Sequence, residues 1–284
     1  MKLAGGVRGL VCVLFSFAAV HAAPVIDDAA IEEKFTAGLQ QKGVDGLGGE
    51  AATKALAAAR GKTAEVDADK GSAVSNYEEA CRSVVIIGSA DYCRDCRTTH
   101  MGAVSTGWVV DPRGRIMTNH HVLEDKQADE LGVMTFDGRV FPVRGVLAAD
   151  LEGDAVILEI DPGDAELPAL ALSETARTGE AIRVIGHPDG RFYSLSEGIV
   201  SRVFTEAAGE GKVRRTWLTV TADYGAGSSG APVLDAAGRV VGMVSSTAAL
   251  LADTEEGKEP AAEDVQMVFR DCVSVETMRR LISR

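Results

Sequence analysis

The sequence lacks any apolar run long enough for a membrane span, and its most apolar stretch lies near the start of the 284-residue chain. This run, Leu10–Val20, follows Lys2 and Arg8 and ends at small residues, which is the pattern of a signal peptide. It is too short to cross a bilayer, and no later stretch is longer. We therefore predict a signal peptide at 1–22 and an exported mature chain, periplasmic or secreted, with no membrane insertion once the signal is cleaved.

Positive charge is also scarce. The chain has 29 Lys and Arg residues against 42 Asp and Glu residues, for a formal net charge of −13. No stretch combines basic and aromatic side chains, and an acidic protein repels nucleic acids. We therefore predict no nucleic-acid partner. Hydrophobic residues make up 46% of the chain, which is enough for a sizeable core and excludes global disorder.

Cysteines are few, and four follow the signal peptide: Cys81, Cys93, Cys96 and Cys272. An even number in an exported chain indicates two disulfides, with three possible connectivities. The close pair Cys93 and Cys96 could instead be redox-active or, with His100, form one corner of a metal site. A second ligand pair at matching spacing is absent. We therefore predict disulfides, no metal and no cofactor.

Residues 23–75 differ in composition from the rest of the chain, since Ala, Glu, Lys and Gly dominate. Two short helices are expected around 27–41 and 50–60, separated by glycines. Apolar residues are too few for an independent core. We predict a loosely packed, partly helical leader or linker of low complexity; the alternative is an inhibitory pro-segment.

From residue 83 onward the chain changes to short β-branched runs separated by turns, for example at 103–111, 140–148, 155–160 and 239–245. Many short strands at regular spacing indicate a sandwich or barrel. A short helix at 275–282 closes the chain.

A glycine-punctuated loop, Tyr224–Val233, carries two adjacent serines, Ser228 and Ser229. A serine on a tight glycine turn exposes its hydroxyl beside free backbone N–H groups, as an acyl-transfer nucleophile requires. By itself the pattern also fits an ordinary hairpin connection.

Two upstream stretches supply a base and an acid. His120 and His121 follow a predicted strand and its turn, and Asp154 directly precedes a buried strand. Each alone has an ordinary structural explanation, a buried histidine or a solvated acid. Together with the serine loop they give the order His, Asp, Ser.

With these motifs the sequence resembles a trypsin-fold serine peptidase of the bacterial HtrA/Deg type. The resemblance covers roughly 80–284, and further matching stretches are Ser105–Val110, Ile185–Pro188 and Ser196–Ser201. It implies an all-β fold of two six-stranded antiparallel β-barrels with a short C-terminal helix, in a protease domain at 76–284. We expect protein or peptide substrates and a protease domain without the PDZ domain common in this type; the sequence does not indicate an oligomeric state.

The resemblance also implies roles for individual residues. His121 would be the base, Asp154 the orienting acid and Ser229 the nucleophile that forms an acyl-enzyme. The N–H groups of Gly227 and Ser229 would bind the oxyanion, and His120 would have no catalytic role. The sequence therefore predicts a serine endopeptidase; the rival is a catalytically inactive homologue that serves as a binding or scaffolding protein.

Substrate preference depends on Asp223, which lies six residues before the nucleophile. In trypsin-like enzymes that position lines the base of the primary specificity pocket, where a buried carboxylate would favour Arg or Lys before the scissile bond. The acidic insertion 252–264 would border the pocket. The alternative is a solvated loop and an Asp223 side chain that points away.

The resemblance also favours one disulfide pattern. Because the chain ends approach each other in this fold, it favours a bridge between Cys81 and Cys272 and a local bridge between Cys93 and Cys96.

Overall fold

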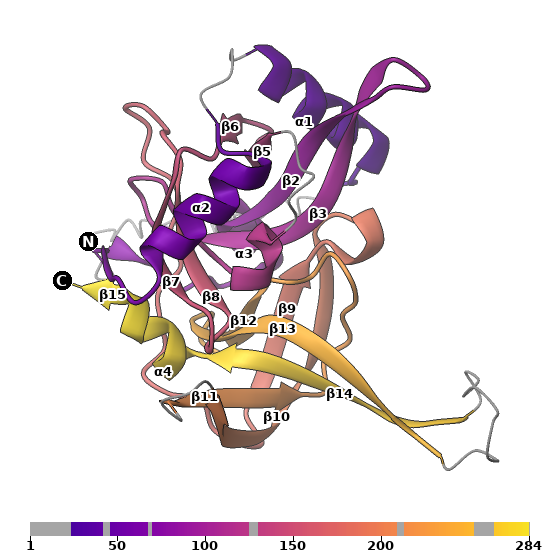
Figure 1. Cartoon of the computed structure of the whole chain (residues 1–284). Coiled ribbons are helices and arrows are strands. Elements are labelled where there is room, and N and C mark those ends of the chain that lie inside the picture. Colours follow the sequence, from indigo (N-terminus) through magenta and orange to yellow (C-terminus); the bar gives the residue numbers. More distant parts are fainter. Residues whose placement is uncertain are drawn as a thin grey trace, which may run out of the picture.

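The computed structural model describes residues 24–41, 46–67, 70–124, 130–208, 213–252 and 264–283. The predicted signal peptide therefore lies outside the described residues. Strands dominate the described chain and form two large antiparallel sheets, with helices on the first (Figure 1). No helix in these ranges combines the length and the apolarity needed to cross a membrane.

The first sheet contains seven strands in the order β6-β5-β2-β3-β4-β8-β7. It is built from the β-branched runs of the first half of the chain, such as Val84–Ile87, whose side chains are almost completely buried. The strands are β2 (Val84–Cys93), β3 (Thr98–Asp111), β4 (Arg115–Thr118), β5 (Leu131–Thr135), β6 (Val140–Pro142), β7 (Gly145–Asp150) and β8 (Ala155–Glu159).

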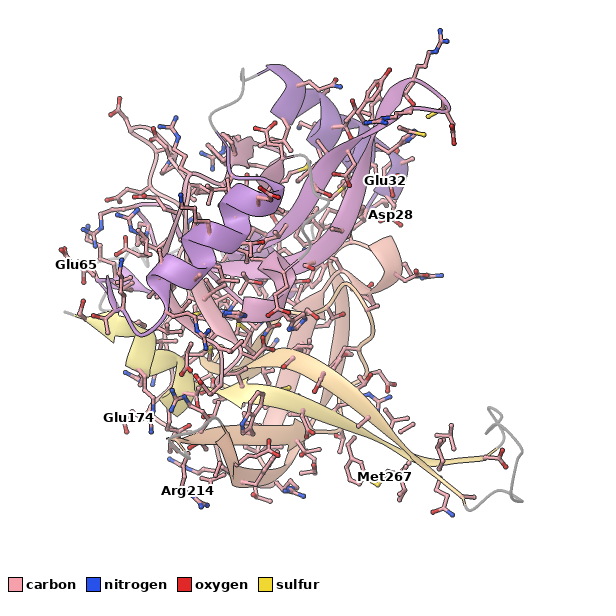
Figure 2. All side chains as sticks on the ribbon, viewed as in Figure 1. Asp28, Glu32, Glu65, Glu174, Arg214 and Met267 are labelled. Atoms are coloured by element: carbon pink, nitrogen blue, oxygen red, sulfur yellow. The ribbon has the colours of Figure 1, made fainter. Side chains whose placement is uncertain are left out.

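The second sheet is a closed six-stranded barrel in the order β10-β11-β14-β13-β12-β9. Its strands are β9 (Ala181–Gly186), β10 (Ser194–Ala208), β11 (Val213–Val220), β12 (Pro232–Asp235), β13 (Val240–Leu251) and β14 (Val265–Ser274). Strands β13 and β14 extend beyond the barrel as a long two-stranded arm, on which Met267 lies (Figures 1 and 2). The predicted all-β class with two barrel-like sheets is confirmed.

The strand count of the first sheet differs from the prediction. A single strand was expected at 140–148, but the segment forms β6 and β7, which lie at opposite edges of the sheet. Pro142 ends β6 because it has no N–H group to donate to a continuing ladder. The first sheet has seven strands, one more than the six-stranded barrel that the resemblance implies.

The leader forms the two expected helices, α1 (Asp28–Gln41) and α2 (Gly49–Ala59). The expected loose packing is wrong, because Phe35, Leu39 and Leu56 are buried in the same apolar clusters as the first sheet. The leader has too few apolar residues for a core of its own and shares the core of the sheet. Whether the protease domain is best divided from the leader at residue 76 stays a prediction.

The two ends of the described chain also meet. A two-residue strand of the leader, β1 (Ala64–Glu65), pairs in parallel with β15 (Ile282–Ser283). The helix predicted at 275–282 is shorter than expected: α4 (Val275–Met278) continues as a 3₁₀ turn before β15. Between the leader and β2, a short helix α3 (Tyr77–Ser83) is capped by the Asn76 side chain, which accepts the amide hydrogen of Glu79.

Candidate active site

The three predicted catalytic side chains come from both sheets. His121 lies in a 3₁₀ turn (His120–Leu123) after β4, and Asp154 lies in the turn between β7 and β8. Both belong to the first sheet, whereas Ser229 lies in the loop that precedes β12 of the barrel. The candidate site therefore lies where the two sheets meet.

Hydrogen-bond distances connect the three side chains in one line. The His121 Nε2 atom lies 2.9 Å from Ser229 Oγ. On the opposite side of the ring, His121 Nδ1 lies 2.9 and 3.0 Å from the two carboxylate oxygens of Asp154. The His121 backbone N–H also donates to Asp154 Oδ1, over 3.1 Å. The structure thus brings together the three residues that the motif order singled out.

The glycines on both sides of the serine pair are required by the backbone. Gly227 and Gly230 have φ values of 92° and 86°, a region that other residues rarely adopt. A Cβ atom at Gly227 would collide with the His187 carbonyl oxygen, and one at Gly230 with that of Thr106. Glycine therefore lets the loop turn sharply while it packs against both neighbouring segments.

Hydrogen bonds from the first sheet hold the serine loop in place. The Thr106 N–H donates to the Ser229 carbonyl, and the Thr106 hydroxyl donates to the Gly227 carbonyl, both over 2.8 Å. The Thr118 hydroxyl in turn donates to the Thr106 carbonyl. Threonines of β3 and β4 therefore fix the position of the serine loop relative to the histidine that follows β4.

Backbone donors remain available beside Ser229. The N–H groups of Ser228 and Ala231 donate within the loop, to the carbonyls of Gly225 and Ser228 respectively. Within the described part of the chain, the N–H groups of Gly227 and Ser229 donate to no other protein group. These are the two amides expected to bind an oxyanion.

Sequence reasoning missed one partner of the acid. The Ser245 hydroxyl, on β13 of the barrel, donates to Asp154 Oδ2 over 2.6 Å. The Asn119 side chain donates to the Asp154 carbonyl over 2.9 Å. Asp154 has a φ of 46°, so its backbone conformation is an uncommon one that these contacts help to hold. No local motif marks Ser245, because its role depends on how the two sheets pack.

A buried ion pair supports the turn that carries Asp154. Arg215, on β11, donates to both carboxylate oxygens of Asp150, with Nη2 2.9 Å from Oδ1. Asp150 also accepts the Gly153 N–H, one residue before Asp154. The side chains of Arg215 and Asp150 are only 11% and 8% exposed. A bidentate pair of this kind has strict geometry, so it aligns the two sheets at the site.

The three histidines near the serine loop have different surroundings. The Asp154 hydrogen bond raises the pKa of His121, although burial of the ring opposes this shift. The neighbouring His120 is buried and its Nδ1 lies 3.1 Å from Glu124, away from the serine. His187 is fully buried, which lowers its pKa to about 4, and its ring bonds the backbone of Val85 and Tyr193. Only His121 is placed to exchange a proton with Ser229.

The leader reaches this region through an intermediate loop. Asp28, at the start of α1 (Figure 2), accepts the Phe192 N–H over 3.2 Å. The same loop donates the Asp189 N–H to the Ala226 carbonyl of the serine loop over 2.7 Å. The leader therefore supports the loop beside the serine; inhibition by this segment stays a prediction.

The Asp223 carboxylate is not buried, in agreement with the alternative expected for this position. The Asp223 side chain is 85% exposed, and its Oδ1 lies 2.6 Å from Arg270 Nη2. Arg270 lies on β14, far along the chain, so the pairing depends on the barrel register. Of the acidic insertion 252–264, residues 253–263 lie outside the described residues.

The structure does not form the predicted disulfides. Cys81 and Cys272 are buried free thiols in different apolar clusters, because Cys81 lies on α3 and Cys272 lies inside the barrel on β14. Burial raises their pKa values to about 11 and about 12. Cys93 and Cys96 are also free, although they lie close together.

Comparison with known proteins agrees with this geometry. Residues 105–243 match the family described as trypsin-like peptidase domain. Protease Do-like 5, chloroplastic, of Arabidopsis thaliana is 27% identical over 193 residues, which is 61% of this chain and 60% of the relative. A probable periplasmic serine endoprotease DegP-like of Pseudomonas savastanoi pv. phaseolicola is 32% identical over 144 residues, 50% of this chain and 28% of the relative.

A third relative, serine endoprotease DegS of Haemophilus influenzae, is 27% identical over 140 residues, 49% of this chain and 40% of the relative. The chain therefore spans between 28% and 60% of the lengths of these three relatives. Residues 105–243 are therefore similar to trypsin-like peptidase domains, and these relatives carry the names of Do-like, DegP-like and DegS proteases.

Proposed function

We propose that this chain is a serine endopeptidase that hydrolyses peptide bonds of proteins through His121, Asp154 and Ser229. The observation that carries the proposal is the line of hydrogen bonds from the Asp154 carboxylate through the His121 ring to the Ser229 hydroxyl. The proposal also agrees with the trypsin-like family match and with relatives named as endoproteases.

In the first half of the reaction, Ser229 Oγ attacks the carbonyl carbon of the scissile bond while His121 Nε2 takes its proton. Asp154 holds the Nδ1–H tautomer and stabilises the imidazolium that results. When the C–N bond breaks, His121 returns the proton to the leaving amine and the acyl group stays on Ser229. In the second half, water attacks the acyl-enzyme, again with His121 as the base, and restores the free hydroxyl.

The negative charge that develops on the substrate oxygen needs donors that are already in place. The N–H groups of Gly227 and Ser229 flank the nucleophile and are not used by the loop itself. In serine peptidases, losing one such donor costs about 3–4 kcal/mol of transition-state stabilisation. The glycine at 227 therefore has a chemical role in addition to its conformational one.

A fluorophosphonate probe tests the proposal, because it labels only a serine that is activated as a nucleophile. We expect labelling of the wild-type chain and of Ser228→Ala, and none of Ser229→Ala. Ser228 is the matched control because it is the adjacent serine and is buried. Absence of labelling in the folded wild-type chain would instead favour the inactive binding protein, the second candidate. The measurement is repeated on Asp28→Ala, which removes the leader's hydrogen bond to the Phe192 N–H while the leader stays packed in the core, and this variant distinguishes latency from inactivity.

Preference for a basic residue before the scissile bond is the finer part of the proposal, and it depends on Asp223. Because Arg270 already pairs with that carboxylate, a substrate Arg or Lys must compete with an internal cation. We expect Arg270→Ala to raise the ratio of kcat/KM for Arg over Val peptides, and Asp223→Asn to abolish the gain. An unchanged ratio in Arg270→Ala would reject a role for Asp223 in specificity.

Export completes the proposal. It is supported by the signal-peptide pattern at 1–22 and by relatives named as periplasmic endoproteases. The substrates would then be proteins of the compartment outside the cytoplasm. Cell fractionation, with N-terminal sequencing of the mature protein, tests both the location and the cleavage site.

A further inference from the structure

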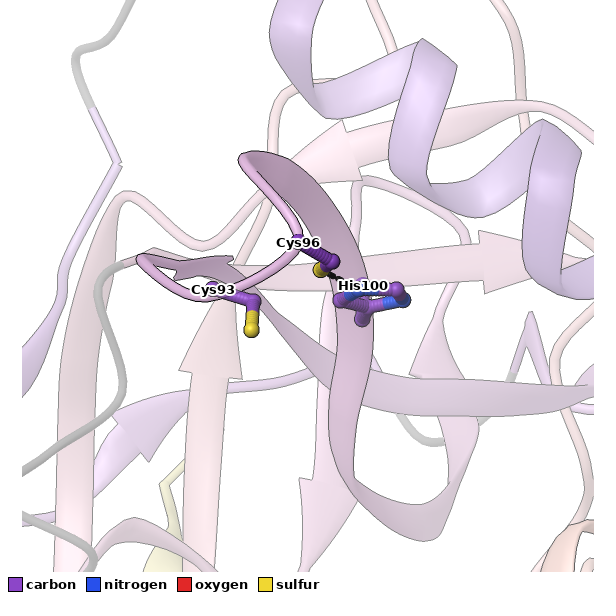
Figure 3. Close-up of side chains that lie close together, drawn as sticks. All are labelled: Cys93, Cys96 and His100. Carbon is purple, nitrogen blue, oxygen red and sulfur yellow. Dashed lines mark hydrogen bonds between the residues drawn. The ribbon is translucent and has the colours of Figure 1, made fainter.

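A second cluster of reactive side chains lies far from the serine loop, at the tip of the β2–β3 hairpin. Cys93 ends β2, Cys96 lies in the turn and His100 lies near the start of β3 (Figure 3). Their ligand atoms, two sulfurs and one imidazole nitrogen, all lie within 4.8 Å of one another. The proposed peptidase reaction uses none of them.

The hairpin register explains why these side chains converge. In the ladder, Cys93 is paired with Thr98 and Asp91 with His100. Side chains of alternate residues share a face, so Cys93 and His100 lie diagonally on one face of the hairpin. The strand pairing therefore places Cys93 and His100 on the same face of the hairpin.

The turn brings in the third side chain. The Arg97 N–H donates to the Cys93 carbonyl over 2.9 Å, and Arg97 has a φ of 58°, so the chain folds tightly back between the two cysteines. Cys96 Sγ then lies 2.9 Å from His100 Nε2 (Figure 3). The Thr98 hydroxyl lies 3.0 Å from this sulfur and 2.9 Å from the same nitrogen.

We propose that Cys93, Cys96 and His100 form a zinc-binding site with one open coordination position. Thiolate and imidazole are the ligands that Zn²⁺ prefers, and three protein ligands leave a fourth position for water or another group. Zinc–ligand bonds of about 2.0–2.3 Å in a tetrahedron place neighbouring ligand atoms about 3.5–3.8 Å apart. The separations here, from 2.9 Å up to at most 4.8 Å, span that value, so small side-chain rotations suffice.

The chemistry of Cys96 agrees with this site. The thiolate is the form that binds metals, and the cysteine is exposed, so a metal ion can reach it. The buried thiols Cys81 and Cys272 have the opposite properties.

Metal analysis of the full chain, purified with a phosphine reductant so that no disulfide competes, tests this site. After equilibration with ZnCl₂ and dialysis, we expect one zinc per wild-type chain. Cobalt in place of zinc should give the thiolate charge-transfer band and the intense visible bands of tetrahedral Co²⁺. Cys96→Ser and His100→Ala should weaken zinc binding at least tenfold, whereas Arg94→Ala, between the two cysteines, should keep it. Equal zinc content in wild type and Cys96→Ser would overturn the proposal.

Thiol reactivity gives a second, independent measurement. We expect zinc to slow the reaction of the half-buried Cys93 and the exposed Cys96 with a disulfide reagent and to leave the buried Cys81 and Cys272 unaffected. Unchanged rates in the presence of zinc would also reject the site. Fluorophosphonate labelling of Ser229 should be the same in Cys96→Ser and wild type, so that failure of the zinc site and failure of the peptidase proposal remain distinguishable.

Discussion

Two histidines in this chain bond a nucleophilic side chain at the same distance. His121 Nε2 lies 2.9 Å from the Ser229 oxygen, and His100 Nε2 lies 2.9 Å from the Cys96 sulfur. The first pair lies between two sheets and is backed by Asp154 on the other ring nitrogen. The second lies on one exposed hairpin, where Thr98 shares the same ring nitrogen.

The difference shows that the group bonded to the histidine, besides the nucleophile, determines whether the pair is suited to proton transfer or to metal binding. A hydroxyl loses its proton only during the reaction, so it needs a base held in one tautomer by an acid. A thiol beside a histidine ionises near neutral pH without such support, and it is then suited to bind a metal. The following predictions test this contrast, from the largest effect to the smallest.

The largest effect is expected for Asp154→Asn, which should lower kcat about 10⁴-fold because the amide favours the wrong His121 tautomer. Asparagine tolerates the positive φ at this position, so the variant should fold. Steady-state hydrolysis of a peptide substrate measures the loss. Asp95→Asn, between the two hairpin cysteines, is the matched control and should keep full activity. A loss below tenfold for Asp154→Asn would contradict the proposed role.

A smaller effect is expected for Ser245→Ala. The variant removes a hydrogen bond to a charged carboxylate, worth about 1.5–3 kcal/mol, so kcat should fall about 10–100-fold. Since Asp154 would also be held less firmly, the pKa that the acid limb of the kcat/KM profile reports for His121 should change. The adjacent, exposed Ser246→Ala is the control. Equal activity in both variants would mean that Ser245 does not help to orient the acid.

The pKa shifts of the two pairs have opposite directions, so the two reactions should lose rate at different acid pH values. Asp154 raises the pKa of His121, and His121 must be neutral to accept the Ser229 proton. Thus kcat/KM should fall about tenfold per pH unit once the pH drops below a pKa higher than the usual value of about 6.5. Alkylation of Cys96 should persist to about pH 6, because His100 lowers the pKa of this thiol. An acid limb of kcat/KM below pH 6 would disagree with the proposed pairing.

The smallest effect is expected for Cys96→Ser on peptide hydrolysis. The Cys96 side chain is exposed and lies in the β2–β3 turn, outside the loop that carries Ser229. Peptide hydrolysis should therefore stay within about twofold of wild type. Kinetics under reducing conditions, without added zinc, provide the measurement. A loss as large as that of Ser245→Ala would show that the hairpin communicates with the serine loop.

The three residues of the proposed catalytic site could be singled out from sequence because each lies in a short local motif. The glycines around Ser229 have positive φ values, and Asp154 precedes a buried strand, so residue type and position carry the information. The ends of the two leader helices were also close to the prediction. In each case the determining interactions lie within a few residues along the chain.

Contacts between distant segments could not be predicted. The pairing of Asp223 with Arg270, and of Asp154 with Ser245, depends on which strands of the barrel are neighbours. The burial of Phe35 against the first sheet likewise needs the packed structure, since α1 alone has too few apolar residues to indicate it. The expected Cys81–Cys272 bridge failed for the same reason: proximity of the chain ends did not place these two thiols in the same apolar cluster.

The hydrogen bonds of the site cross between the two sheets twice. Ser245 and Ser229 belong to the barrel, whereas Asp154 and His121 belong to the first sheet, so the line of bonds leaves the barrel and returns to it. Sliding of one sheet against the other would change the lengths of both outer bonds together. Under the proposed function, peptide hydrolysis would therefore require the two sheets to keep their relative positions.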